Sequence, residues 1–100
     1  MKVNFNGDLL PSDEATLNLN NRGYNYGDSL FETMRVINSK IMFWESHYFR
    51  LMSSMRILRM SIPMDFSPEF LEEKIIELIK ANDLGSSPVR IKINIHREAG

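Results

Sequence analysis

The chain has 100 residues, of which 43% are hydrophobic and 25% are charged, with 12 basic and 13 acidic side chains. This length suits one small domain, and the composition is that of an ordinary globular protein rather than a disordered or fibrous one. A formal net charge of -1 excludes the broad positive surface of a general nucleic-acid-binding protein. The absence of cysteine excludes disulfides and thiolate metal sites, and it fits a reducing compartment.

The first residues of the chain predict a β-hairpin. Met1, Val3 and Phe5 alternate with polar residues, and the tripeptide Asn6-Gly7-Asp8 follows them. Asn and Gly tolerate positive φ, so this tripeptide favours a tight turn into a second strand. The alternation is unlike the apolar stretch of a secretion signal, and no apolar run elsewhere is long enough for a membrane-spanning helix. We therefore expect a soluble, cytoplasmic protein that does not act at a membrane.

A loop and a second hairpin are expected next. The segment from Asn18 to Asp28 is rich in Asn, Gly and Tyr and has little periodicity, which predicts an ordered loop. Leu30 to Ile37 then predicts a strand, Asn38-Ser39 its turn and Lys40 to Trp44 the returning strand, because β-branched and aromatic residues suit a pleated sheet.

Two amphipathic helices follow. Between Glu45 and Met60 the apolar residues recur at spacings of three and four, which is typical of a helix with one buried face. The second helix has Ser67 as its N-cap and Pro68 in its first turn, and Asn82 to Gly85 ends it. The predicted buried residues of the two helices are Tyr48, Leu51, Met52, Met55, Leu58, Leu71, Ile75, Leu78 and Ile79.

The last predicted element is a half-buried strand with one polar face. Ile91, Ile93 and Ile95 occupy alternate positions, and polar residues lie between them. The order of elements is then β-β-β-β-α-α-β. This order predicts an α+β fold in which two helices cover one face of a small, mainly antiparallel sheet.

Residue types alone give little evidence for a catalytic site. His47 and His96 are the only histidines, and their positions lack the spacing of a zinc site. No serine lies in the G-x-S-x-G pattern of a hydrolase nucleophile. The sequence therefore predicts neither a metal site nor a hydrolase.

Arg50 is the charged residue with the most informative position. It lies three residues after His47 on one stripe of the first helix, where a guanidinium could bind a phosphate through two parallel hydrogen bonds. The same spacing describes an exposed arginine paired with Glu45 or another surface acid, which is the more common arrangement. Spacing alone leaves both interpretations open.

The third strand and the loop before it contain further candidates. Alternate residues of a strand share one face, so Phe31, Thr33 and Arg35 could line a pocket together, or Phe31 could be core and Arg35 merely exposed. In the loop, Gly23 and Gly27 could let the backbone approach a ligand closely, or they could simply form a turn.

Two motifs of this sequence resemble motifs of the class IV aminotransferases. The segment from Arg22 to Val36, RGYNYGDSLFETMRV, is similar to the pattern R-G-x-x-x-G-D-x-x-F-E-T-x-R-V of that family. Further on, Glu45 to Leu51, ESHYFRL, resembles the pattern E-x-H-x-x-R-L at the start of a helix. The family uses pyridoxal 5′-phosphate and includes branched-chain aminotransferases, D-amino-acid aminotransferases and aminodeoxychorismate lyases.

The resemblance implies roles for several residues. Arg50 matches the arginine that binds the cofactor phosphate in the family. Phe31 matches a residue that lines the substrate pocket, and a phenylalanine cannot donate the hydrogen bond that a tyrosine there gives to a substrate carboxylate in some relatives. Thr33 and Arg35 share its face and become pocket candidates. The residues expected to shape the loop are Arg22, Gly23, Gly27 and Asp28.

The resemblance also implies a domain organisation. Residues 1–100 would form the N-terminal small domain, and the cofactor lysine would lie in a larger C-terminal domain that is absent here. None of the five lysines of the chain stands in the family's catalytic context, so we expect no catalytic residue within it and no activity of this domain alone. These lysines are Lys2, Lys40, Lys74, Lys80 and Lys92.

The expected function is a step of amino-acid metabolism carried out by a homodimer. The reaction would be amino-group transfer between amino and keto acids, or pyruvate release from aminodeoxychorismate. The alternative is a free-standing, non-catalytic binding or assembly module derived from the same family.

Overall fold

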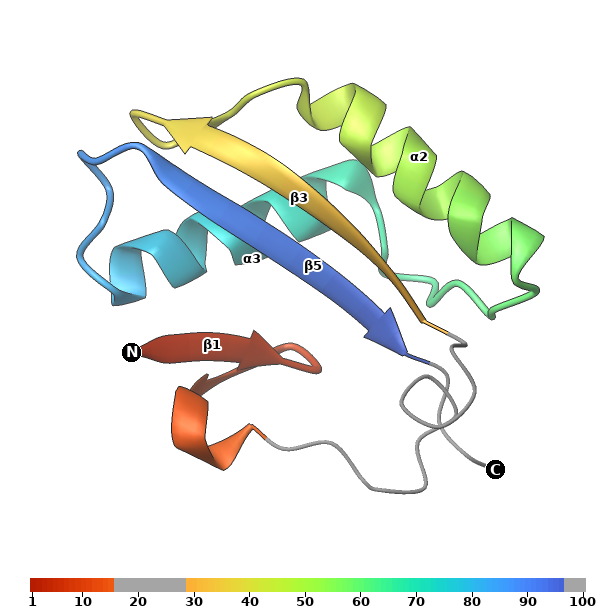
Figure 1. Cartoon of the computed structure of the whole chain (residues 1–100), viewed down its shortest axis with the longest axis horizontal. Helices are drawn as coiled ribbons and strands as arrows, with labels where there is room; N and C mark the ends of the chain where they lie inside the picture. Colours follow the sequence, from red (N-terminus) through yellow and green to blue (C-terminus); the bar gives the residue numbers. More distant parts are fainter. Residues whose placement is uncertain (16–28, 97–100) are drawn as a thin grey trace.

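The computed structural model describes residues 1–15 and 29–96. The predicted loop from Asn18 to Asp28 and the last four residues lie outside the described residues. The described elements follow the predicted order (Figure 1). They are β1 (Lys2–Phe5), β2 (Asp8–Pro11), a short 3-10 helix (Ser12–Glu14), β3 (Ser29–Ile37), β4 (Lys40–Ile41), α2 (Trp44–Ile57), α3 (Pro68–Ala81) and β5 (Val89–His96).

The described strands form two antiparallel sheets. β1 pairs with β2 in one sheet, and the second sheet has the order β4-β3-β5. Asn82, the C-cap of α3, links this helix to β1. Its side chain accepts a hydrogen bond from the backbone N of Lys2 at 2.8 Å and donates one to the carbonyl of Lys2 at 2.9 Å. The α+β class is confirmed, and the structure adds that the strands are divided between two sheets.

Both predicted hairpins turn through two consecutive residues with positive φ. These are Asn6 and Gly7 in the first turn, with φ of 54° and 95°, and Asn38 and Ser39 in the second, with φ of 51° and 61°. Positive φ at both central positions matches the right-handed twist of the flanking strands. Ser39 is less suited to this conformation than glycine, and its hydroxyl donates a hydrogen bond to the carbonyl of Gly85 at 3.1 Å.

The predicted strand from Lys40 to Trp44 is wrong beyond Ile41. β4 contains only Lys40 and Ile41, Phe43 has a φ of 55°, and Trp44 is the first residue of α2. The indole of Trp44 donates a hydrogen bond to the carbonyl of Pro68 at 3.2 Å, which connects the beginnings of the two helices. A long-range contact of this kind overrides the local strand preference of aromatic residues.

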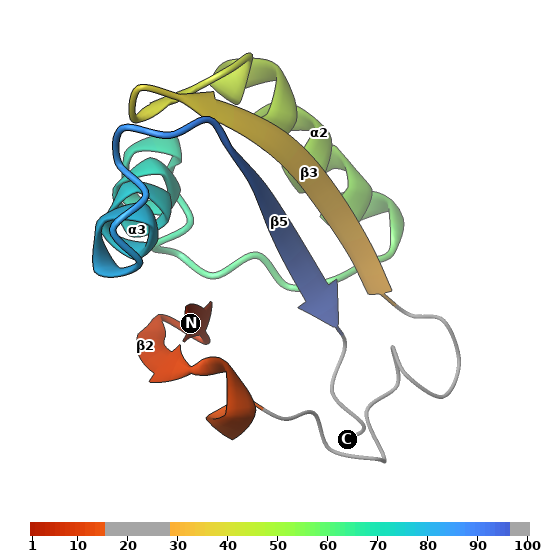
Figure 2. The ribbon, with the colours of Figure 1, turned by 60° about the vertical axis from the view of Figure 1, so that its left-hand side comes forward.

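Both helices pack on the same face of the β3–β5 pair, as predicted. Met34 and Val36 are each 1% exposed and belong to a cluster with Ile75 and Ile79 of α3. α2 packs a second cluster against the same face, formed by Leu51, Met52 and Met55 with Leu30, Ile93 and Ile95. In Figure 1 α3 passes behind the two long strands, and in Figure 2 α2 lies behind β3; no described element crosses the face of these strands that is turned toward the viewer.

The start of α3 is as predicted. The hydroxyl of Ser67 accepts a hydrogen bond from the backbone N of Phe70 at 3.0 Å, and Pro68 is the first helical residue. No helix in the described part of the chain has the length and apolar character needed to cross a bilayer.

Candidate functional site

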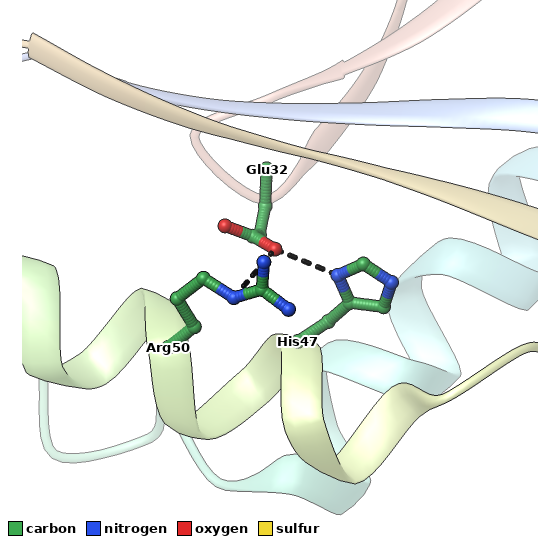
Figure 3. Close-up of polar contacts among 3 residues, drawn as sticks. All are labelled: Glu32, His47 and Arg50. Atoms are coloured by element: carbon green, nitrogen blue, oxygen red, sulfur yellow. Dashed lines mark hydrogen bonds and ion pairs between the residues drawn. The ribbon is translucent and has the colours of Figure 1, made fainter.

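The candidate site lies where the first half of α2 runs beside β3. Glu32 is on the face of β3 that carries Leu30 and Met34, and its side chain is only 12% exposed. A carboxylate on an apolar face has to be paired to offset the loss of its hydration. His47 and Arg50 provide the partners, because residues three apart on a helix share one side of it. Figure 3 shows both side chains reaching from α2 toward Glu32.

The two partners hold Glu32 differently. Nδ1 of His47 lies 2.6 Å from Oε1 of Glu32, so the imidazole donates a short hydrogen bond to the carboxylate, and its side chain is 16% exposed. Nε of Arg50 lies 3.5 Å from the same oxygen, whereas a charge-assisted hydrogen bond is about 2.7–2.9 Å long. The Arg50 side chain is 62% exposed. His47 therefore fixes the carboxylate, and Arg50 keeps an accessible guanidinium.

The ion pair of Arg50 is not the pair with a surface acid that its spacing in the sequence allowed. Its partner is Glu32, which is nearly buried and comes from another element, and not Glu45 of the same helix. The contact joins the two motifs of the sequence, because Glu32 belongs to the first and Arg50 to the second.

The three strand candidates share one face, as predicted. Phe31, Thr33 and Arg35 are all exposed on the side of β3 that faces away from the helices. Arg50 approaches β3 from the helix side, so the structure groups these three residues together and does not bring Arg50 into their face.

β5 adds three polar residues to this face. The antiparallel register places Asn94 opposite Phe31, Lys92 opposite Thr33, and Arg90 opposite Arg35. Nζ of Lys92 lies 4.7 Å from the ring centroid of Phe31, within the range of a cation–π interaction. We call these six residues the basic face: it has three cations and no acid, and it suits an anionic ligand.

The open edge of β3 separates the basic face from Arg50. β4 pairs only with Val36 and Ile37, and the carbonyl of Arg35 accepts from the backbone N of Met42 at 2.8 Å. In the described part of the chain, the stretch from Ser29 to Met34 has no strand partner on the side away from β5. α2 runs along this side (Figure 1).

Sequence reasoning missed Glu32 and assigned His47 no partner. The available signal was the alternation of the strand, because Glu32 lies in register with Leu30, Met34 and Val36 and is the only charged residue among them. Arg90 and Lys92 were recognised only as part of a polar face. The pairing of β5 with β3 places Arg90 and Lys92 opposite Arg35 and Thr33.

A shallow cavity elsewhere contains none of the predicted site residues. Its lining combines Met55, Met60 and Ile95 with the polar side chains of Arg59, Ser61 and His96. Within residues 1–15 and 29–96, no group of three acidic or histidine side chains is arranged to hold a metal ion.

Comparison with known proteins gives the family. Residues 29–100 match the model of the family described as amino-transferase class IV. The chain is 31% identical to a D-alanine aminotransferase of Listeria monocytogenes over 93 residues, which cover 93% of this chain and 32% of that protein. It is 33% identical to a D-alanine aminotransferase of Bacillus licheniformis over 82 residues, covering 82% of this chain and 28% of that protein.

Solved structures of related enzymes superpose on this chain. The branched-chain aminotransferase of the thermophilic archaeon Thermoproteus uzoniensis, solved with norvaline, superposes with a TM-score of 0.82 at 26% identity, covering 96% of this chain and 33% of that one. A protein from Legionella pneumophila assigned as a 4-amino-4-deoxychorismate lyase superposes with a TM-score of 0.71 at 30% identity, covering 85% of this chain and 30% of that one. The chain spans about a third of the length of these relatives. It belongs to the class IV aminotransferase family.

Proposed function

We propose that this chain is the N-terminal domain of a pyridoxal-phosphate-dependent aminotransferase or lyase, and that it supplies one wall of the active site. The observation that carries the proposal is the contact of Arg50 with Glu32, because it unites the two family motifs in one cluster that leaves a guanidinium accessible. Family membership supports the same interpretation. The cofactor lysine is assigned to none of the five lysines of this chain, and a second domain would provide it.

The residues present fit the phosphate of the cofactor. A guanidinium binds a phosphate through two parallel hydrogen bonds, and Arg50 is exposed enough to do so without displacing a core residue. When bound, pyridoxal phosphate supplies an electron sink for negative charge at the reacting carbon of an amino acid. Arg50 anchors this group by its phosphate and takes no part in bond making.

The basic face would form the substrate side of the site. Amino and keto acids carry carboxylates, and Arg35 with its neighbours Arg90 and Lys92 offers cations for them. Phe31 contributes an exposed apolar surface next to Lys92, and Thr33 contributes a hydroxyl. The open edge of β3 allows the substrate and the cofactor phosphate to be bound on its two sides.

The reaction class can be decided in one experiment on the full-length gene product loaded with pyridoxal phosphate. An aminotransferase is expected to convert the bound cofactor to pyridoxamine phosphate when D-alanine or a branched-chain L-amino acid is added, which absorbance spectroscopy detects. A lyase would instead release pyruvate from aminodeoxychorismate. If neither reaction occurs with any of these substrates, the enzyme assignment fails and a non-catalytic module derived from the family becomes the better account.

A homodimer is part of the proposal. Phe43, Phe49 and Ile57, at the start of α2 and along it, are 77%, 57% and 79% exposed. Large apolar side chains at the surface are suited to a protein interface. Sedimentation of the full-length protein as a monomer at micromolar concentration would contradict this part.

A further inference from the structure

We infer that Glu32 is a positioning residue, which orients Arg50 so that its two terminal nitrogens, Nη1 and Nη2, face the cofactor phosphate. This inference rests on the proposed function, because it requires that Arg50 binds phosphate. Glu32 itself would touch neither cofactor nor substrate.

The position of Glu32 suggests more than a structural role. Its side chain is 12% exposed on a face whose neighbouring positions are the apolar Leu30 and Met34. An apolar side chain could fill such a position without loss of hydration, whereas a carboxylate must be compensated by partners. The partners that compensate it are His47 and Arg50, and Arg50 is the residue to which the phosphate role is assigned.

The contact with Glu32 selects one edge of the guanidinium. An arginine can bind an oxyanion through Nη1 and Nη2 or through Nε and one terminal nitrogen. Oε1 of Glu32 lies 3.5 Å from Nε of Arg50 and therefore takes the Nε side. The edge formed by Nη1 and Nη2 remains for a phosphate. A long side chain that is oriented before binding also loses less conformational entropy on binding.

His47 prevents the carboxylate of Glu32 from neutralising the charge of Arg50. The short hydrogen bond from Nδ1 of His47 occupies the same oxygen that Arg50 approaches, at 2.6 Å against 3.5 Å. His47 and Arg50 come from one turn of α2, so the helix fixes their spacing around the carboxylate (Figure 3). Glu32 is thus held by His47 while its weaker contact aligns Arg50.

Charge and orientation predict opposite results when Glu32 loses its charge. A carboxylate repels a phosphate, so charge alone predicts that its removal tightens binding of pyridoxal phosphate. Loss of orientation predicts weaker binding. Because the signs differ, the substitution Glu32→Gln, which keeps the shape of the side chain, decides between them.

The test compares the affinities of the full-length protein for pyridoxal phosphate and for pyridoxal, which lacks the phosphate. We expect Glu32→Gln to raise the Kd for pyridoxal phosphate about fivefold, the effect of one typical hydrogen bond, and to leave the Kd for pyridoxal unchanged. Glu45→Gln, an exposed acid in the first turn of α2, is the matched control and is expected to change neither. An unchanged or lower Kd for pyridoxal phosphate in Glu32→Gln overturns the inference, and so does an equal loss for both ligands.

Two further variants keep the test decisive. Glu32→Asp retains the charge but withdraws it from Nε by one methylene, so orientation predicts weaker binding of pyridoxal phosphate and charge predicts no change. It replaces Glu32→Gln if that variant does not fold.

In an Arg50→Ala background, Glu32→Gln is expected to have no further effect on the affinity for pyridoxal phosphate, and a full additional loss of affinity contradicts positioning through Arg50. If Arg50→Ala itself leaves the affinity unchanged, the proposed phosphate role fails. If only Arg50→Ala weakens binding, the positioning role alone fails.

Discussion

Replacing Arg50 with alanine is expected to weaken the binding of pyridoxal phosphate to the full-length protein by at least about 150-fold, because two charge-assisted hydrogen bonds of about 1.5–3 kcal/mol each are lost and every 1.4 kcal/mol is tenfold. The affinity for pyridoxal is expected to stay unchanged, since pyridoxal has no phosphate. Arg50→Lys is expected to lose about tenfold, because a point charge keeps the attraction but not the planar pair of donors. Equilibrium titration of both ligands measures these changes.

The matched control for Arg50 is Arg56, which is exposed in the last turn of the same helix. Arg56→Ala removes an equal charge from α2 and is expected to leave both affinities unchanged. Unaltered binding of pyridoxal phosphate to Arg50→Ala would refute the phosphate role. A similar loss in Arg56→Ala would mean that net charge, and not the position of Arg50, governs affinity.

Replacing Met34 with alanine is expected to destabilise the domain by about 2–5 kcal/mol, the usual cost of removing a large apolar side chain from a packed core. Met34 is 1% exposed and packs with Val36, Ile75 and Ile79, where β3 meets α3. Because small domains are stable by only about 5–15 kcal/mol, the loss should be a large part of the total. Urea denaturation of the 100-residue chain, followed by circular dichroism, measures it.

Met64 provides the control for this substitution. It is fully exposed in the connection between the helices, so Met64→Ala removes the same atoms from water and not from the core. Its denaturation midpoint is expected to match that of the unchanged chain. Equal midpoints for the two variants would contradict the core assigned to β3 and α3.

The elements that sequence reasoning predicted well are those encoded by neighbouring residues. Asn6-Gly7 and Asn38-Ser39 form the expected turns because the residues themselves adopt positive φ. Ser67 caps α3 through a hydrogen bond that spans three residues. The alternation along β3 was enough to place Phe31, Thr33 and Arg35 on one face.

The errors and omissions concern contacts between distant residues. Trp44 was assigned to a strand, but its hydrogen bond to the carbonyl of Pro68 spans 24 residues and was not visible in the local pattern. Glu32 received no role, because its partner His47 lies 15 residues away on another element. The approach of Arg50 to β3 from the side opposite Phe31 likewise depends on how α2 packs. The loop from Asn18 to Asp28 and its glycines lie outside the described residues.

The central claim is that these residues form one wall of a pyridoxal-phosphate site whose lysine comes from another domain. The most direct test is to add pyridoxal phosphate to the full-length gene product, reduce it with borohydride and locate the modified lysine by peptide mass. The account predicts a single pyridoxyl adduct on a lysine outside the 100 residues of this chain. An adduct on Lys92, the lysine that lies on the basic face beside Phe31, or no adduct at all, would contradict it.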